Sequence, residues 1–225
     1  MFSYAPGDSF ESEPLRQQED LFTTPGSLAI DPTFATARRT ALDATSWVEL
    51  VPGWMSGSER LFDRLASAVP WSQHYRTLFD QRFLEPRLTA EYRSLRRVPH
   101  EMLITAARAL SERYGVEYDS LWLNLYRNGE DSTGWHRDRF SCRRPECIVP
   151  VLTLGATRRF QLKLRAGGPS LSLSPNSGDL IVMGGRCQQD WVHGVPKLPE
   201  VLEPRISLNF QSSMQAGRQR KLAER

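Results

Sequence analysis

The sequence predicts a mainly β, α+β domain, an antiparallel sandwich or jelly roll with helices packed against its outside. Three observations predict it. Two segments with apolar residues at helical spacing lie before Gly115, a period-two alternation of apolar and polar residues follows it, and glycine-rich turns separate the alternating segments. Many short strands after two helices are typical of this architecture.

Two helices are expected first. One begins at Ser58, a residue type that caps helices, and stops at Pro70. The other begins near Pro99 and stops at Gly115, a residue that ends helices readily. The strands expected after them are Leu121–Arg127, Ile148–Leu154, Arg159–Leu164, Leu171–Leu173, Asp179–Met183 and Arg205–Ser212.

Composition divides the chain of 225 residues into three parts. Residues 1–45 are rich in Pro, Gly, Ser, Thr and acids without a sustained period, so we expect a mostly disordered acidic arm. Residues 46–215 would form the folded domain, and 216–225 a basic C-terminal tail. A basic body suits a polyanionic partner such as nucleic acid; a merely solvated surface is the alternative.

Several classes are excluded by what the sequence lacks. No apolar run approaches the ~18 residues of a membrane span, and the first residues do not resemble a secretory signal. Cys142, Cys147 and Cys187 are too few for a disulfide scaffold, so we expect a cytoplasmic protein. We also expect a monomer. The spacing of Cys142 and Cys147 leaves a second metal site open.

Residues Gln18–Phe22 read Gln-Glu-Asp-Leu-Phe. This resembles the short Gln-x-x-Leu-Phe peptides that dock on bacterial replication sliding clamps. A sliding clamp is therefore one expected partner, and a chance hydrophobic pair in a linker is the alternative.

His136 and Asp138 form the most informative chemical pattern. Residues two apart in an extended segment face the same side, so both side chains can reach one ion, and the distant His193 offers a third ligand. Two histidines and a carboxylate are the facial triad of non-haem iron(II) oxygenases, which leaves coordination positions open. Alone, the pattern also fits histidines that only form hydrogen bonds, as we expect for His74 and His100.

The surrounding sequence resembles the AlkB family of Fe(II)- and 2-oxoglutarate-dependent dioxygenases. The resemblance runs from about Glu85 to Ser212, more than half of the chain. Its first motif, Pro86–Tyr92, is similar to the start of the substrate-recognition region in bacterial members. The others are Leu123–Asp138 (LNLYRNGEDSTGWHRD), Gly178–Gly185, His193–Lys197 and Pro204–Leu208.

The resemblance implies a double-stranded β-helix, or jelly roll, with flanking N-terminal helices. His136, Asp138 and His193 would hold Fe(II). The implied reaction uses O₂ and 2-oxoglutarate to oxidise an N-methyl group on a base such as 1-methyladenine or 3-methylcytosine. It releases succinate, CO₂ and formaldehyde together with the repaired base.

By the same resemblance, Asn124, Tyr126 and Arg205 would bind 2-oxoglutarate. A planar guanidinium grips a carboxylate through two charge-assisted hydrogen bonds. The family strand usually reads Arg-x-Asn-x-Thr-x-Arg, whereas this chain carries Ser207, Asn209 and Gln211 at its last three defined places. We still expect Gln211 near the cosubstrate. Because an amide cannot offset a carboxylate charge, binding should be weaker by roughly tenfold to a hundredfold.

Four residues are candidate contacts to nucleic acid: Arg87, Tyr92, Arg139 and Phe140. DNA-repair members usually carry acidic residues directly after the aspartate ligand, where they help to read the damaged base. Here Arg139 and Phe140 follow instead, a pair suited to a phosphate contact and base stacking, or to a changed substrate. For Arg87 and Tyr92, an ordinary exposed face is the alternative.

Three hypotheses follow. The leading one is oxidative demethylation of alkylated bases in DNA or RNA. The second keeps the oxygenase chemistry and changes the substrate to a protein or small molecule. The third is a catalytically silent nucleic-acid-binding module, which the altered strand with Gln211 suggests.

Overall fold

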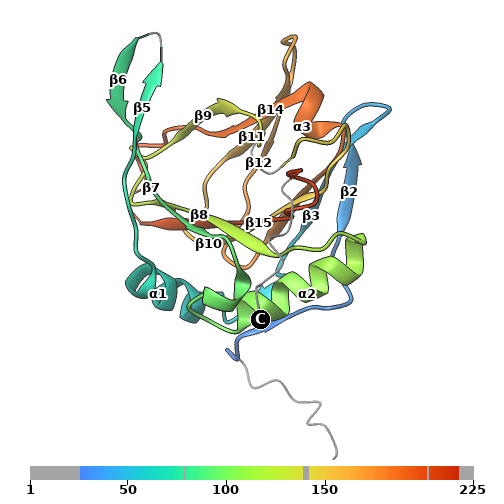
Figure 1. Ribbon diagram of the computed structural model, residues 1–225, viewed down its shortest axis with the longest axis vertical. Helices are drawn as coiled ribbons and strands as arrows, with labels where there is room; N and C mark the ends of the chain where they lie inside the picture. Colours follow the sequence, from blue (N-terminus) through green and yellow to red (C-terminus); the bar gives the residue numbers. More distant parts are fainter. Residues whose placement is uncertain (1–25, 79, 139–141, 202, 218–225) are drawn as a thin grey trace, which may run out of the picture.

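Two antiparallel sheets of unequal size face each other, and helices α1 and α2 cover the outer face of the larger one (Figure 1). The computed structural model describes residues 26–78, 80–138, 142–201 and 203–217. The larger sheet has the order β2-β3-β13-β10-β15-β8-β7. Its strands are β2 (Arg38–Ala41), β3 (Ser46–Val51), β7 (Leu88–Tyr92), β8 (Ser120–Tyr126), β10 (Val149–Gly155), β13 (Leu180–Gly185) and β15 (Arg205–Gln211).

The smaller sheet has the order β12-β11-β14-β9. Its strands are β9 (Thr133–His136), β11 (Phe160–Leu164), β12 (Ser170–Leu173) and β14 (Trp191–Val195). Two further pairs stand apart from both sheets: β1 (Ala29–Ile30) with β4 (Met55–Ser56), and the hairpin of β5 (Tyr75–Leu78) and β6 (Gln81–Leu84), which projects at the upper left of Figure 1.

Both predicted helices are confirmed as α1 (Ser58–Ala68) and α2 (Met102–Tyr114). Gly115 ends α2 with a left-handed φ of 65°, a conformation that glycine adopts without strain. The structure adds a short helix, α3 (Cys187–Asp190), and a 3₁₀ turn (Leu95–Arg97). Within the described ranges, no helix is both long and apolar enough to cross a bilayer.

The six predicted strands are present, with ends shifted by at most two residues. The prediction of an arm through residue 45 is corrected for residues 26–45, where β1 and β2 pair with β4 and β3. Phe34 anchors this segment in the core, 4% exposed and stacked on Trp54 at 5.6 Å between ring centroids. A single buried aromatic residue leaves no periodic pattern in the sequence, so periodicity did not indicate that this segment is folded. Residues 1–25 and 218–225 lie outside the described residues.

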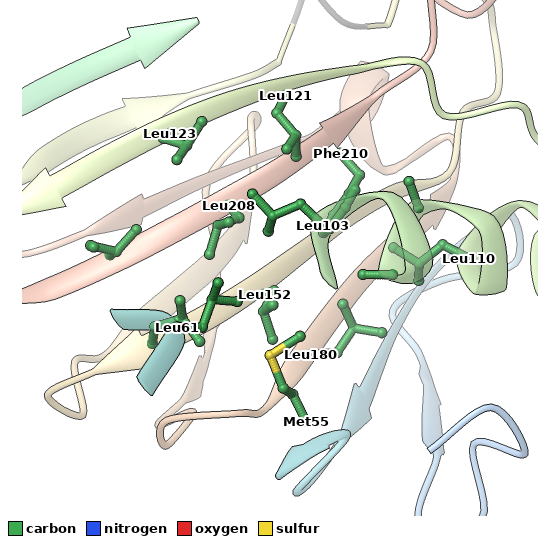
Figure 2. Close-up of a cluster of buried hydrophobic side chains, with 14 of the residues drawn as sticks. Met55, Leu61, Leu103, Leu110, Leu121, Leu123, Leu152, Leu180, Leu208 and Phe210 are labelled. Carbon is green, nitrogen blue, oxygen red and sulfur yellow. The ribbon is translucent and has the colours of Figure 1, made fainter. Parts of the chain in front are cut away.

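The main core lies between the two helices and the larger sheet (Figure 2). Leu103 and Leu110 of α2 meet Leu121 and Leu123 of β8 and Phe210 of β15, all fully or almost fully buried. Because strand side chains alternate between faces, the residues between these leucines point to the opposite side of the sheet. That side carries the polar groups of the candidate site.

Arg158 is a basic residue that does not contribute to the surface charge of the basic body, because its side chain is buried. It is 1% exposed and donates hydrogen bonds of 2.8–2.9 Å to the backbone carbonyls of Asn128, Asp131 and Pro196. A longer bond of 3.4 Å reaches the carbonyl of Gly129. Arg158 thus fastens the loop after β8 to the segment after β14.

Replacing Arg158 with leucine should therefore lower the free energy of unfolding by about 3–5 kcal/mol, because several buried carbonyls lose their donor. Denaturant unfolding measures the change. The neighbouring Arg159 is exposed, so Arg159→Leu is the matched control and should change stability by no more than about 0.5 kcal/mol. Equal effects of the two substitutions would contradict the structural role of Arg158.

Candidate active site

Three predicted ligands converge between β9 and β14. His136 on β9 lies opposite His193 on β14 in the antiparallel register, and Asp138 follows β9 directly. The Asp138 carboxylate oxygens lie 3.6 Å from His136 Nε2 and 3.5 Å from His193 Nε2. One ligand atom from each residue lies within 4.8 Å of the other two. This spacing suits one ion that bonds nitrogen and oxygen at about 2.1 Å.

Glycine beside His193 permits this convergence. A Cβ at Gly194 would lie 2.8 Å from the Thr133 carbonyl oxygen, closer than side-chain carbon atoms approach backbone oxygen. Gly194 therefore allows the β14 backbone to pass close to β9 beside the ligand pair. Phe160 supports the other side of His193, with ring centroids 5.4 Å apart.

The electrostatics of the three groups suit metal ligation. Burial alone would raise the pKa of Asp138, but His193, His136 and a hydrogen bond from Asn209 lower it to about 2. Burial lowers the pKa of His193 to about 4. Burial would also lower the pKa of His136, yet the hydrogen bond and charge of Asp138 raise it. At neutral pH the carboxylate is thus ionised and His193 is neutral, the forms that bind metals.

Neighbouring groups orient the ligands. His136 Nδ1 lies 2.9 Å from the Gly134 carbonyl oxygen, which can only accept, so Nδ1 carries the proton and Nε2 is available to a metal. The backbone N–H of Asp138 donates to Gln188 Oε1 at 2.8 Å. These contacts hold the imidazole and the carboxylate in position before an ion binds.

A cavity of about 1660 Å³ opens beside the three ligands. Its floor is the polar face of the larger sheet, where alternate residues of β8 and β15 lie opposite one another in register. Across the strand pair these are Tyr126 with Arg205, Asn124 with Ser207, Trp122 with Asn209, and Ser120 with Gln211.

Arg205 is buried, 1% exposed, at one end of this floor. Its Nη2 donates to Thr153 Oγ1 at 3.1 Å, while its Nε and Nη1 are buried without a hydrogen-bond partner. Burial lowers its pKa, but a guanidinium stays charged at neutral pH. A buried cation with two unused donors is suited to a carboxylate, so the site fits 2-oxoglutarate.

Asn124 joins the predicted cosubstrate and substrate residues in one network. Its Oδ1 accepts from Arg87 Nε at 3.0 Å and from Trp122 Nε1 at 3.1 Å. Its Nδ2 donates to Ser207 Oγ at 3.2 Å. Tyr126 is held separately by a 2.8 Å hydrogen bond with Thr133. Both predicted residues therefore line the cavity in fixed orientations.

Of the other predicted site residues, some line the cavity and others do not. Gln211 lines the cavity, but at the end of β15 opposite to Arg205. Arg87 also lines it and pairs with Glu85 at 3.4 Å. The prediction that Tyr92 contacts the substrate is corrected, because Tyr92 packs against the main core. Its neighbours Glu91 and Arg93 line the cavity instead. Arg139, Phe140 and the Gln18–Phe22 motif lie outside the described residues.

The open possibility of a second metal site at Cys142 and Cys147 is ruled out, because the two residues form a disulfide. The bond closes a short loop that follows the ligand segment, and the backbone N–H of Cys142 donates to the Asp138 carbonyl at 2.8 Å. Cys187 is a buried free thiol.

Sequence reasoning missed two residues of the site. Trp122 lines the cavity floor, and Thr153 binds the guanidinium of Arg205. Strand alternation places Trp122 on the same face as Asn124, so period-two spacing was the available signal for it. Thr153 carries no such signal, because its contact depends on the pairing of β10 with β15.

Comparison with known proteins agrees with this geometry. Residues 85–211 match the family model described as the 2OG-Fe(II) oxygenase superfamily. The match covers more than half of the chain and contains the ligands His136, Asp138 and His193 together with Arg205. The chain therefore belongs to the 2OG-Fe(II) oxygenase superfamily, whose members use Fe(II) and 2-oxoglutarate.

Within the superfamily, this chain is similar to proteins named as AlkB homologues. This chain is 32% identical over 189 residues to alpha-ketoglutarate-dependent dioxygenase alkB homolog 3 of Bos taurus and of Homo sapiens. The aligned segment covers 74% of this chain and 66% of each relative. It is 28% identical to DNA oxidative demethylase ALKBH2 of Arabidopsis thaliana over 67% of this chain and 60% of that protein. The chain thus spans slightly less than two thirds of these relatives.

Solved structures show a similar fold. A 2OG-Fe(II) oxygenase family oxidoreductase from Burkholderia pseudomallei superposes with a TM-score of 0.50 at 19% identity, over 73% of this chain and 84% of that one. The structure of OsALKBH1 superposes with a TM-score of 0.53 at 14% identity, over 78% of this chain and all of that one.

Proposed function

We propose that this protein oxidatively demethylates N-alkylated bases in nucleic acid, using Fe(II), 2-oxoglutarate and O₂. One observation carries the proposal: the His136, Asp138 and His193 cluster opens onto a cavity that also contains the unused donors of Arg205. The AlkB-type relatives, one of them named a DNA oxidative demethylase, support a nucleic-acid substrate.

We also infer that the two facing sheets are the halves of a double-stranded β-helix. The larger sheet supplies Asn124, Tyr126 and Arg205, and the smaller sheet supplies His136 and His193. Such a division places the metal ligands on one wall of the cavity and the proposed cosubstrate contacts on the other.

The chain's own residues have distinct tasks. His136, Asp138 and His193 would hold Fe(II), which supplies the oxidising chemistry with O₂ and 2-oxoglutarate when bound. Arg205 binds and orients a carboxylate of the cosubstrate. Asn124, fixed by Arg87 and Ser207, positions its amide along the same floor. The buried walls around His193 and Arg205 exclude water from the reacting groups.

The substrate enters from the open side of the cavity. Arg87, Arg96 and Arg137 are among its lining residues, and guanidinium groups contact phosphate well. A methyl group on the pairing edge of a base weakens its pairing, so such a base is cheaper to flip out of a duplex.

The direct test incubates the protein with an oligonucleotide that contains 1-methyladenine, together with Fe(II), 2-oxoglutarate and O₂. We expect formaldehyde and succinate in equal amounts and loss of the methyl group from the oligonucleotide. Omission of 2-oxoglutarate is the control and should prevent all three.

Two other outcomes would contradict the proposal. Turnover of 2-oxoglutarate that no methylated nucleic acid stimulates would favour a protein or small-molecule substrate. Salt-sensitive DNA binding without binding of iron or 2-oxoglutarate would favour a silent nucleic-acid-binding module.

A further inference from the structure

The backbone of the metal ligand Asp138 is held from both sides. Its N–H donates to Gln188 Oε1 at 2.8 Å, and its carbonyl accepts from the backbone N–H of Cys142 at 2.8 Å. Gln188 is 2% exposed and Cys142 is 3% exposed, so both contacts are shielded from water. Because the carboxylate of Asp138 lies between His136 and His193, these backbone contacts help to set its distance from the two imidazoles.

Both contacts lead to the same segment of the chain. Gln188 belongs to α3, the short helix beside β14 in Figure 1. Cys142 is joined by the disulfide to Cys147, whose backbone N–H donates to the carbonyl of Gly185 at 3.0 Å. Gly185 is the last residue of β13, and α3 and then β14 follow it. The contacts therefore form a closed ring, which runs from Asp138 through the disulfide to Gly185 and back through Gln188.

The disulfide of this ring acts on a small part of the protein. The sequence separation of Cys142 and Cys147 is only five, and a short loop restricts the unfolded chain less than a long one does. Both cysteines belong to the smaller hydrophobic cluster, which also contains Phe160, the residue stacked on His193. The main effect of the disulfide should therefore be local, at the ligand Asp138.

A second cavity gives access to the disulfide. Its volume is about 340 Å³, and Cys147 lines it together with Arg144 and Glu146. Arg144 and Glu146 are exposed, so this cavity reaches the protein surface. The metal ligands are not among the described residues that line it. A reductant can thus approach the disulfide without entering the active-site cavity.

We propose that the disulfide of Cys142 and Cys147 positions Asp138 and makes iron binding depend on the redox state of the protein. A dithiol reductant supplies two electrons and two protons: the S–S bond breaks to give two thiols, and the reductant becomes a disulfide. The N–H of Cys142 is then no longer tied to Gly185 through Cys147, so the Asp138 backbone is held less firmly. The oxidised protein binds Fe(II) more tightly than the reduced protein. This inference rests on the iron site and not on the substrate.

The test compares the Fe(II) affinity of oxidised and reduced protein by anaerobic calorimetry. Dithiothreitol reduces the protein and is removed by gel filtration without oxygen. Thiol titration in denaturant should count one thiol before reduction, that of Cys187, and three after it. We expect reduction to raise the Kd for Fe(II) about tenfold, because loss of a group that orients a metal ligand costs roughly 10–100-fold.

Two variants serve as controls. The double variant Cys142→Ala/Cys147→Ala should show the raised Kd already, and dithiothreitol treatment should not change it further. Cys187→Ala keeps the disulfide, so its Kd should still rise about tenfold on reduction. If reduced wild type and the double variant both bind Fe(II) within twofold of the oxidised wild type, the inference is overturned.

Hydrogen exchange separates positioning from general destabilisation. NMR of the iron-free protein should show that the amide of Cys142 exchanges about tenfold faster after reduction, while the amide of Leu123 in the main core keeps its rate. Equal acceleration at both amides would show a global loss of stability and would overturn the positioning role. If neither redox state binds iron, the metal site itself is refuted and this inference with it.

Discussion

Replacing His136 with alanine is expected to weaken Fe(II) binding more than about 100-fold, because even the loss of a partner behind a metal ligand costs 10–100-fold. His136 Nε2 lies 3.6 Å from the Asp138 carboxylate and belongs to the three-residue cluster. Anaerobic titration calorimetry with Fe(II) measures the loss, and demethylation should fall to background in the same variant.

His100 provides the matched control. It lies before α2 and its Nδ1 accepts a hydrogen bond from the backbone N–H of Met102 at 3.1 Å, outside the cavity. His100→Ala should therefore bind Fe(II) as the wild type does. Undiminished iron affinity in folded His136→Ala would show that the metal site is elsewhere.

Replacing Arg205 with leucine is expected to raise the Kd for 2-oxoglutarate by about 100-fold or more. Two charge-assisted hydrogen bonds of about 1.5–3 kcal/mol each would be lost, and 1.4 kcal/mol is a factor of ten. Arg205→Lys keeps the charge without the forked geometry, so we expect about a tenfold loss. Calorimetry with the iron-loaded protein under anaerobic conditions measures both values.

Arg205→Leu should also change how the Tm of the protein depends on 2-oxoglutarate. Nε and Nη1 of Arg205 are buried without partners, and an uncompensated buried charge is costly. Arg205→Leu should therefore keep or raise the Tm of the protein without 2-oxoglutarate, while the rise in Tm caused by 2-oxoglutarate disappears. A variant that retains this rise would show that the cosubstrate binds elsewhere.

Elements with strong local patterns could be predicted from the sequence. The helix that ends at Gly115 and the alternating strand around Asn124 needed only periodicity and a stop signal. β9 and β14 were not predicted, because each is four or five residues long and contains glycine. What stabilises them is their pairing with each other, in which His136 meets His193, and such long-range pairing leaves no local pattern.

In the candidate site, too, residues with a local sequence pattern could be predicted and residues placed by long-range packing could not. The three metal ligands were expected from the His-x-Asp pattern with a distant histidine. The resemblance to the AlkB family implied Asn124, Tyr126 and Arg205, which all line one cavity. Tyr92 was predicted to contact nucleic acid, but Glu91 and not Tyr92 shares a face with the cavity residues of β8. The structural role of Arg158 could not be predicted, because a buried arginine that binds backbone carbonyls has no sequence signal of its own.

The most direct test of the account is an anaerobic titration of the wild-type protein with Fe(II) followed by 2-oxoglutarate, read by visible absorption. The convergence of His136, Asp138 and His193 beside Arg205 predicts a weak charge-transfer band that saturates at one equivalent of each. The absence of such a band, in protein that circular dichroism shows to be folded, would contradict the assignment of this cavity as an iron and 2-oxoglutarate site.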